Sequence, residues 1–197
     1  KGVNESLMFR GARWCKTVMS GEVNILIVDD ESLIRMDLRD ILESEQHEVV
    51  GEACNGVEAI MMCKDLQPDA VLMDVKMPEL DGIEAARQIG YNHLAPVVLL
   101  TSYSQQDLVA KARESGVYGY LIKPVREEQL IPTLEMARGR FLDEAESRQQ
   151  MADLEKSLEE RKLIQKATGI LMNLYKISED EAYNRIRALS MKKRSSI

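Results

Sequence analysis

The chain of 197 residues is predicted to fold as an α/β protein, with a five-stranded, doubly wound parallel sheet followed by a helical stalk and a small all-α hairpin or bundle. Between residues 24 and 140, short apolar runs alternate with amphipathic segments, which is the pattern of repeated β–α units. The apolar runs are nearly continuous, as in parallel strands covered by helices on both sheet faces. Beyond residue 140 the alternation stops and the composition favours helix.

The expected elements of the first domain alternate along the chain. The strand candidates are rich in Val, Ile and Leu, and they are Ile25–Val28, Val49–Ala53, Ala70–Met73, Val97–Leu100 and Tyr118–Ile122. The helix candidates are Ser32–Glu45, Gly56–Leu66, Gly82–Ile89, Gln105–Ser115 and a helix from Glu127 onward. We therefore expect one compact domain over residues 23–140.

A helical linker is expected over residues 141–160, where Glu, Arg, Gln, Leu and Ala predominate. Met151, Leu154 and Leu158 follow the a, d, a spacing of a heptad repeat. The same frame becomes polar before residue 151, so the pattern extends over only about two turns. It predicts a short seam through which two copies of the stalk pair.

Residues 161–197 are predicted to contain two helices separated by a break. Apolar residues recur at helical spacing in the first helix, at Leu163, Ala167, Ile170, Leu171 and Leu174. Ser178 and Glu181 form the pattern of a capping box, which starts the second helix. That helix has an apolar stripe at Ala182, Ile186 and Leu189. Two helices this short need a third helix, the stalk or a partner chain to enclose a core.

The composition excludes several classes of protein. No apolar run approaches the ~20 residues that span a bilayer, so no association with the membrane is expected. Residues 1–22 contain no apolar stretch of signal-peptide length, and we interpret them as an extension or an expression remnant without a function. The three cysteines, Cys15, Cys54 and Cys63, lack the spacing of a zinc site or a disulfide framework. A reducing, cytoplasmic location is therefore expected.

The net charge of −7 conceals an uneven distribution. Residues 161–197 contain nine Lys and Arg against three acidic residues, a local charge of +6, so the remaining 160 residues must carry −13. An acidic body with a basic end suggests that the end meets a polyanion. The alternative is a solvated helical surface that is basic without a partner.

Polar side chains stand where the predicted strands end, which is where open α/β sheets place their functional sites. These side chains are Asp29, Asp30, Asp74, Thr101 and Lys123. Three carboxylates, a hydroxyl and an amine are thus expected at one edge of the sheet. A single aspartate there would be read as a helix cap, but five groups on four strands argue against that alternative.

Clustered carboxylates repel one another, so this cluster is expected to hold a divalent cation. Oxygen ligands with water suit Mg²⁺ or Mn²⁺, which bring phosphate oxygens with them, and Lys123 would balance the charge of those oxygens. An aspartate in such surroundings can attack phosphorus and form an aspartyl-phosphate. The haloacid-dehalogenase phosphatases also do this, but they carry D-x-D after the first strand, where this chain has adjacent Asp29 and Asp30. We therefore set that class aside.

The blocks NILIVDDE, AVLMDVKMPELDG, VVLLTSY and GYLIKP, in this order, resemble the signature of the response-regulator receiver domain of two-component signalling. The resemblance covers about residues 23–140 and implies a flavodoxin-like fold. It implies a protein that is phosphorylated by a sensor histidine kinase. The only chemistry implied is Mg²⁺-dependent self-phosphorylation and self-dephosphorylation, so the chain is not expected to be an enzyme.

The resemblance also implies roles for single residues. Asp74 would accept the phosphoryl group. The metal ligands would be Asp29, Asp30, Asp74 and the backbone carbonyl of Lys76.

Three further side chains would sense or contact the phosphoryl group. Thr101 and Lys123 would contact it, and Thr101 would act as a switch together with Tyr120, whose rotamer changes on activation. The peptide bond between Lys123 and Pro124 is expected to be cis.

The segments RKLIQKATGILM and SEDEAYNRIRALSMKKR resemble the ANTAR domain, an RNA-binding three-helix module of transcription antiterminators. The resemblance covers about residues 155–197, and the domain itself is expected at 161–197. The usual A-K-G of the family is Ala167-Thr168-Gly169 here, so one basic contact is missing or shifted. The third helix would begin near Ser195, which leaves most of it outside this sequence.

The expected RNA contacts are Arg161, Lys166, Gly169, Tyr183, Arg185, Arg187, Lys192 and Lys193. Gly169 lies in the middle of a helix and is interpreted as a point of close approach by RNA or another helix, with simple tolerance in packing as the alternative. The ring of Tyr183 is expected to stack on a base or else to cap the small core.

The whole chain resembles the antiterminator regulators of ethanolamine or nitrogen-compound utilisation. The resemblance implies a response regulator that binds RNA stem-loops in nascent transcripts, and the seam in the stalk predicts that it dimerises on phosphorylation. Two alternatives stay open. One is a DNA-binding response regulator, which would need a helix-turn-helix. The other is a receiver with a protein-interaction output, in which the basic face is incidental.

Overall fold

The computed structural model describes residues 23–102 and 116–194, apart from the side chains at 190 and 192–194. The extension expected at 1–22 and the helix expected at 105–115 lie outside the described residues. The chain divides into two compact units, residues 1–143 and residues 144–197, and each is described by itself.

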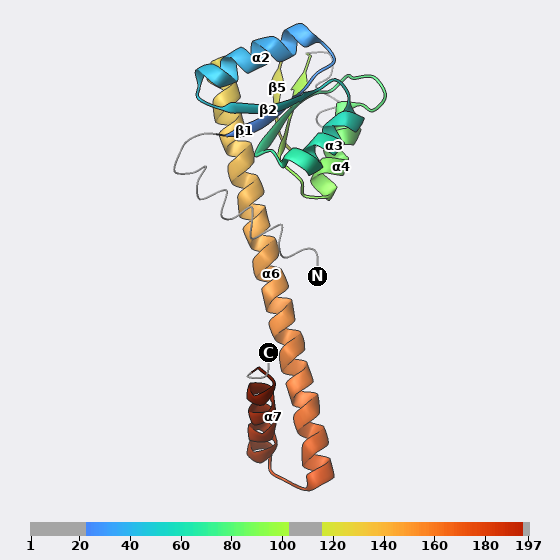
Figure 1. Ribbon diagram of the computed structural model, residues 1–197, viewed down its shortest axis with the longest axis vertical. Helices are drawn as coiled ribbons and strands as arrows, with labels where there is room; N and C mark the ends of the chain where they lie inside the picture. The colour runs from blue at the N-terminus through green and yellow to red at the C-terminus, as the bar shows by residue number, and fades with distance from the viewer. Residues whose placement is uncertain (1–22, 103–115, 195–197) are drawn as a thin grey trace. The chain divides into compact units, whose positions relative to one another are not determined.

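The first unit contains a five-stranded parallel sheet in the order β2-β1-β3-β4-β5 (Figure 1). Its strands are β1 (Asn24–Val28), β2 (Glu48–Ala53), β3 (Ala70–Asp74), β4 (Val97–Thr101) and β5 (Val117–Ile122). The predicted fold is confirmed, and each strand lies within one residue of its expected bounds. The strands β3 and β4 are buried at every position, because each has a strand on both sides and helices on both faces.

Two apolar cores cover the two faces of this sheet. Because side chains alternate along a strand, Leu26 and Val28 belong to one core and Ile25 and Ile27 to the other. The first core packs against α3 (Gly56–Leu66) and α4 (Gly82–Tyr91). The second core packs against α2 (Ser32–Ser44) and the first turns of α6 (Glu127–Tyr175), as Figure 1 shows.

Short polar caps start the helices that follow the strands. The side chain of Asn55 accepts a hydrogen bond from the Glu58 amide, and that of Asp81 accepts one from the Glu84 amide. These caps fix where the loops after β2 and β3 end. The loop after β3 is therefore a closed turn of defined length, which matters for the site at the end of that strand.

The second unit is a helical hairpin made of the last part of α6 and α7 (Glu179–Arg194). The expected break is confirmed: α6 ends at Tyr175, Lys176 has a φ of 55°, and Ser178 Oγ accepts a hydrogen bond from the Glu181 amide at 3.3 Å. Ala182 and Thr168 are buried where the two helices meet. In the described ranges no helix is both long and apolar enough to cross a membrane.

Candidate functional site

A charged cluster lies beyond the carboxyl ends of the strands, where β1 and β3 are neighbours. Lys123 follows β5, and its Nζ lies 2.7 Å from Asp29 Oδ2 and 2.6 Å from Asp74 Oδ1. Thr101, at the end of β4, is fully buried, and its carbonyl accepts a hydrogen bond from the Lys123 amide at 2.8 Å. The structure thus brings together Asp29, Asp74, Thr101 and Lys123, as expected from the strand ends.

The two carboxylates of the cluster are deeply buried. Asp29 is fully buried and Asp74 is 7% exposed, while the side chain of Lys123 is 20% exposed. Burial raises the pKa of Asp74, and the hydrogen bond from Lys123 opposes this rise. Burial also acts to lower the pKa of Lys123, but its hydrogen bonds with Asp29 and Asp74 outweigh burial and leave that pKa raised. One ammonium therefore faces two carboxylates, which leaves a net charge of −1.

Backbone amides hold the second oxygen of each carboxylate. Asp74 Oδ2 accepts a hydrogen bond from the Lys76 amide at 2.9 Å, and Asp29 Oδ1 accepts one from the Glu31 amide at 3.0 Å. Each aspartate is thus fixed by its own loop on one side and by Lys123 on the other. This arrangement fixes the orientation of both carboxyl groups.

Sequence reasoning missed two residues that position the cluster. Gly82 donates its amide to the Val75 carbonyl at 3.0 Å, and a Cβ at Gly82 would lie 1.9 Å from the Asp74 carbonyl oxygen. Only glycine therefore allows the loop after β3 to close against its own strand. Arg35 Nη1 donates to the Asp29 carbonyl at 2.6 Å. The D-G pair in ELDG could have indicated a tight turn, whereas no local pattern marks Arg35.

The donor set suits a hard divalent cation. Asp29 and Asp74 offer carboxylate oxygens in a buried setting that carries excess negative charge, and the Lys123 ammonium occupies the space between them as a stand-in cation. No group of three or more His, Cys, Asp and Glu side chains gathers into a metal cluster within the described ranges, and Asp30 is exposed. A magnesium ion here would need backbone carbonyl and water oxygens besides the two aspartates, which is how Mg²⁺ is commonly held.

Three further expectations concern the surroundings of the cluster. The Lys123–Pro124 peptide bond is cis, as expected. The side chain of Tyr120 on β5 is 50% exposed, in contrast to the buried Thr101. The side chain of Lys76 is exposed, while its backbone amide donates to Asp74.

A groove between α6 and α7 gathers part of the predicted RNA surface. Arg161, Gly169 and Tyr183 line it, together with the carboxylates Glu160, Glu179 and Asp180. A Cβ at Gly169 would meet no described atom within 4 Å, so within the described residues α7 does not approach this glycine closely. Gly169 instead faces open space in the groove.

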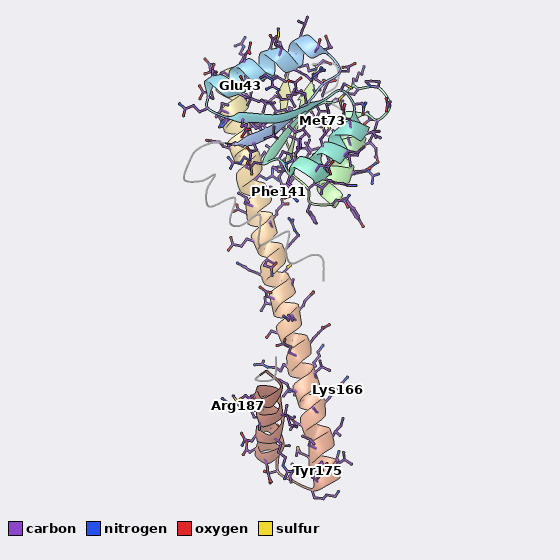
Figure 2. The ribbon with its side chains drawn as sticks, in the orientation of Figure 1. Glu43, Met73, Phe141, Lys166, Tyr175 and Arg187 are labelled. Atoms are coloured by element: carbon purple, nitrogen blue, oxygen red, sulfur yellow. The ribbon has the colours of Figure 1, made fainter. Side chains whose placement is uncertain are left out.

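The other predicted RNA residues whose side chains are described do not line this groove. Figure 2 shows Lys166 and Arg187 on the outer sides of their helices, where both are exposed. Arg185 pairs with Glu181 at 3.2 Å and lies 5.6 Å from the centroid of the Tyr175 ring. The side chains of Lys192 and Lys193 lie outside the described residues.

Comparison with known families matches both parts of the chain. Residues 25–135 match the response regulator receiver domain, and residues 152–197 match the ANTAR domain. The transcriptional regulatory protein PdtaR of Mycobacterium tuberculosis is 43% identical over 173 residues, which cover 88% of this chain and 84% of that protein. The regulator YdfI of Bacillus subtilis is 40% identical over 120 residues, covering 60% of this chain and 56% of that protein.

Solved structures resemble the first unit. The signal receiver domain of a modulated diguanylate cyclase from Desulfovibrio desulfuricans has a TM-score of 0.58 and 34% identity, covering 62% of this chain and 98% of that one. The receiver domain of the sensor histidine kinase PA1611 from Pseudomonas aeruginosa has a TM-score of 0.54 and 27% identity, covering 60% and 98%. That structure holds a magnesium ion coordinated in its active-site cleft.

Proposed function

Because the chain belongs to the response regulators that join a receiver domain to an ANTAR domain, we propose that it is phosphorylated on Asp74 and then controls transcription antitermination by binding RNA. The protein is a signalling protein and a transcriptional regulator of the PdtaR type. The observation that carries the proposal is the contact of Lys123 with two buried aspartates at neighbouring strand ends.

In the proposed chemistry, a carboxylate oxygen of Asp74 attacks the phosphorus of the donor. A new O–P bond forms while the bond from phosphorus to the leaving group breaks, and the leaving group departs with its electron pair. The partner is a sensor histidine kinase, whose phosphohistidine would supply the phosphoryl group. Asp74 must be ionised for this attack, and the ammonium of Lys123 favours the ionised form against the effect of burial.

Asp29, Asp30, Asp74 and the Lys76 carbonyl would hold a Mg²⁺ or Mn²⁺ ion, with the exposed Asp30 as the ligand nearest the solvent. When bound, the ion supplies positive charge that neutralises the phosphoryl oxygens. Lys123 would then turn from the aspartates to a phosphoryl oxygen, and Thr101 would contact another. Thr101 and Tyr120 are the proposed switch, which reports the new charge to the outer surface of the receiver.

The groove between α6 and α7 supports the proposed RNA output. Its charged lining residues, three carboxylates and Arg161, carry a net charge of −2, which disfavours a phosphate there. An unpaired base is neutral, can stack on the half-exposed ring of Tyr183 and can donate from an amino group to a carboxylate. The outward-facing Lys166 and Arg187, together with Arg185 beside Glu181, would meet the phosphates, with Lys192 and Lys193 as further candidates.

Dimerisation on phosphorylation is part of the proposal. Met151, Leu154 and Leu158 are 69%, 65% and 55% exposed, so the predicted seam lies open on α6. Pairing two copies along this stripe would bury these side chains as a short coiled coil. The same exposure favours the second candidate output, a contact with another protein.

The phosphorylation proposal is tested by intact-mass measurement after incubation with a phosphoramidate or acyl phosphate donor. We expect an adduct of about 80 Da, the mass of one phosphoryl group, only when Mg²⁺ is present. The Asp74→Asn variant should form no adduct, whereas Asp37→Asn, a matched change on the exposed side of α2, should label normally. An undiminished adduct on Asp74→Asn would overturn the assignment.

The output is tested by binding to hairpin RNA and duplex DNA at several salt concentrations. If the outward-facing cations contact phosphates, Lys166→Ala should lower the slope of log affinity against log salt by about 0.7 on single-stranded loops. Equal competition by duplex DNA at every salt concentration would favour a DNA-binding output instead. Binding to neither nucleic acid would favour the protein-interaction output.

A further inference from the structure

Arg35 connects α2 to the loop that carries Asp29. Its Nη1 donates to the backbone carbonyl of Asp29 at 2.6 Å, and its Nε donates to Glu52 Oε2 on β2 at 2.9 Å. Its own amide donates to the Glu31 carbonyl at 3.2 Å, so the backbone of Arg35 is also tied to this loop. The side chain is 18% exposed, which shields these hydrogen bonds from water.

Glu52 is itself fixed by a second arginine. Arg39 donates from Nε and Nη2 to Glu52 Oε1, at 2.9 and 2.6 Å. The hydrogen bonds from Arg39 and Arg35 lower the pKa of Glu52, so the carboxylate stays ionised as the anchor of both guanidinium groups. Arg35 is therefore held at one end by a fixed carboxylate and at the other by the carbonyl of Asp29.

We propose that Arg35, anchored by Glu52, is a positioning residue that holds the Asp29 loop in the geometry needed to bind the divalent cation. This inference rests on the proposed function, because it concerns the same cation site. Arg35 would not touch the ion. It would act through Asp29, whose carboxylate already takes one hydrogen bond from the Glu31 amide inside the same loop.

Positioning and electrostatics predict opposite effects for the loss of Arg35. Removal of a positive charge near a cation site strengthens cation binding if the charge acts only through space. Removal of a positioning contact weakens binding, and outer contacts of this kind commonly change metal affinity 10- to 100-fold. The sign of the change therefore distinguishes the two roles.

Arg39 provides a matched control. It binds the same carboxylate from the same helix, and no hydrogen bond from Arg39 to the Asp29 loop is found among the described residues. Arg35→Gln and Arg39→Gln thus remove the same charge and one partner of Glu52 each. Only Arg35→Gln removes the contact with the Asp29 carbonyl.

The experiment measures the Kd of Mg²⁺ by calorimetry on the full chain without a phosphodonor. We expect Arg35→Gln to raise this Kd about tenfold and Arg39→Gln to leave it within about twofold of the wild-type value. Arg35→Lys, which keeps one charged donor, should fall between them. In labelling by a small phosphodonor, Arg35→Gln should shift the Mg²⁺ dependence to higher concentration while saturating Mg²⁺ restores the wild-type rate.

Thermal unfolding by circular dichroism separates positioning from a loss of stability. If Arg35→Gln does not fold, the Kd of Mg²⁺ is measured for Arg35→Lys and Glu52→Gln instead. A Kd unchanged from the wild-type value in both variants would overturn the proposal. An equal or lower Kd in a folded Arg35→Gln protein would also overturn it. Failure of the wild-type chain to bind Mg²⁺ would instead count against the proposed function itself.

Discussion

Lys123 Nζ and Asp74 Oδ1 lie 2.6 Å apart, although the two residues stand at the ends of different strands, β5 and β3. Lys123 also reaches Asp29 at the end of β1, so one ammonium serves two buried carboxylates. The shortage of positive charge in this cluster is the physical feature from which its chemistry follows. It makes the site receptive to a second cation, while burial makes Asp74 costly to keep ionised.

We predict that Asp74→Asn stabilises the receiver at neutral pH. Burial raises the pKa of Asp74 in the folded state above its ordinary value of 3.8, so the folded protein binds this proton more tightly than the unfolded chain does. The stabilising effect of that proton is present at low pH and is lost as the pH rises through the folded-state pKa. Asp74→Asn has no carboxyl group to ionise, so its stability does not fall in this way as the pH rises.

The measurement is the Tm of both proteins from pH 3 to pH 8, in buffer with a metal chelator. The difference in Tm should favour Asp74→Asn at neutral pH and shrink toward zero below about pH 4. Asp37→Asn serves as the control for the loss of one charge. A wild-type protein that is the more stable of the two at pH 7 would contradict the prediction.

Removal of Lys123 should destabilise the receiver strongly. Lys123→Met keeps an unbranched apolar side chain, one atom shorter, but leaves Asp29 and Asp74 buried without their shared cation, at a cost of about 3 kcal/mol. Labelling of Asp74 should remain possible, since the nucleophile is intact, while the response of RNA binding to phosphorylation should be lost. Urea unfolding gives the first quantity, and hairpin binding with and without phosphodonor gives the second.

Magnesium should partly rescue Lys123→Met, because a divalent cation replaces the missing charge between the two aspartates. The Tm of this variant should therefore rise more on addition of Mg²⁺ than that of the wild type. Equal shifts in the two proteins would argue that Lys123 and the metal do not share this space.

The groove in the helical hairpin should lose RNA affinity when its carboxylates are neutralised. Asp180→Asn should weaken hairpin binding if the carboxylate accepts a hydrogen bond from a base, although loss of a negative charge would by itself strengthen binding to RNA. Glu181→Gln is the matched control, since Glu181 lies in the first turn of the same helix but pairs with Arg185. This variant should bind RNA as well as the wild type or better.

The ring of Tyr183 should contribute to RNA affinity by stacking, independently of charge. Tyr183→Ala should cost about 1–3 kcal/mol of RNA binding with little change in the salt slope, and Tyr183→Phe should retain most of the affinity.

For the carboxylates of the groove, equal effects of Asp180→Asn and Glu181→Gln on RNA affinity would show that the groove contributes only general charge. Binding of a loop in which uracil replaces every amino-bearing base should be insensitive to Asp180→Asn.

The seam on α6 should control assembly. Leu154→Lys places a charge in the predicted stripe and should weaken dimerisation of the phosphorylated chain at least tenfold, or about 1.4 kcal/mol. Ala152→Lys adds the same charge at an exposed neighbouring position and should leave assembly unchanged. The molar masses of the phosphorylated variants are measured by light scattering over a concentration series. Equal masses for Leu154→Lys and Ala152→Lys would contradict dimerisation through this seam.

The sequence by itself determined the described strands and helices of this protein and the edge of the sheet where the charged cluster lies. Strand and helix periods are local properties, so the five apolar runs and the start of α6 at Glu127 could be read directly. Parallel strands bring their carboxyl ends to one edge, which made the convergence of Asp29, Asp74 and Lys123 predictable. The break before Glu179 was likewise marked by its capping residues.

Only the tertiary structure decided which of these groups touch and what holds them. The contact between Lys123 and Asp29 joins residues 94 positions apart, and the contact of Arg35 with Asp29 depends on how α2 returns over the sheet. No local period encodes such contacts, because they arise from the packing of elements that are distant along the chain. The same reason explains why the roles of two glycines could not be predicted from the sequence. A side chain at Gly82 would clash with the Asp74 carbonyl, whereas Gly169 faces an open groove, and only the folded structure shows this difference.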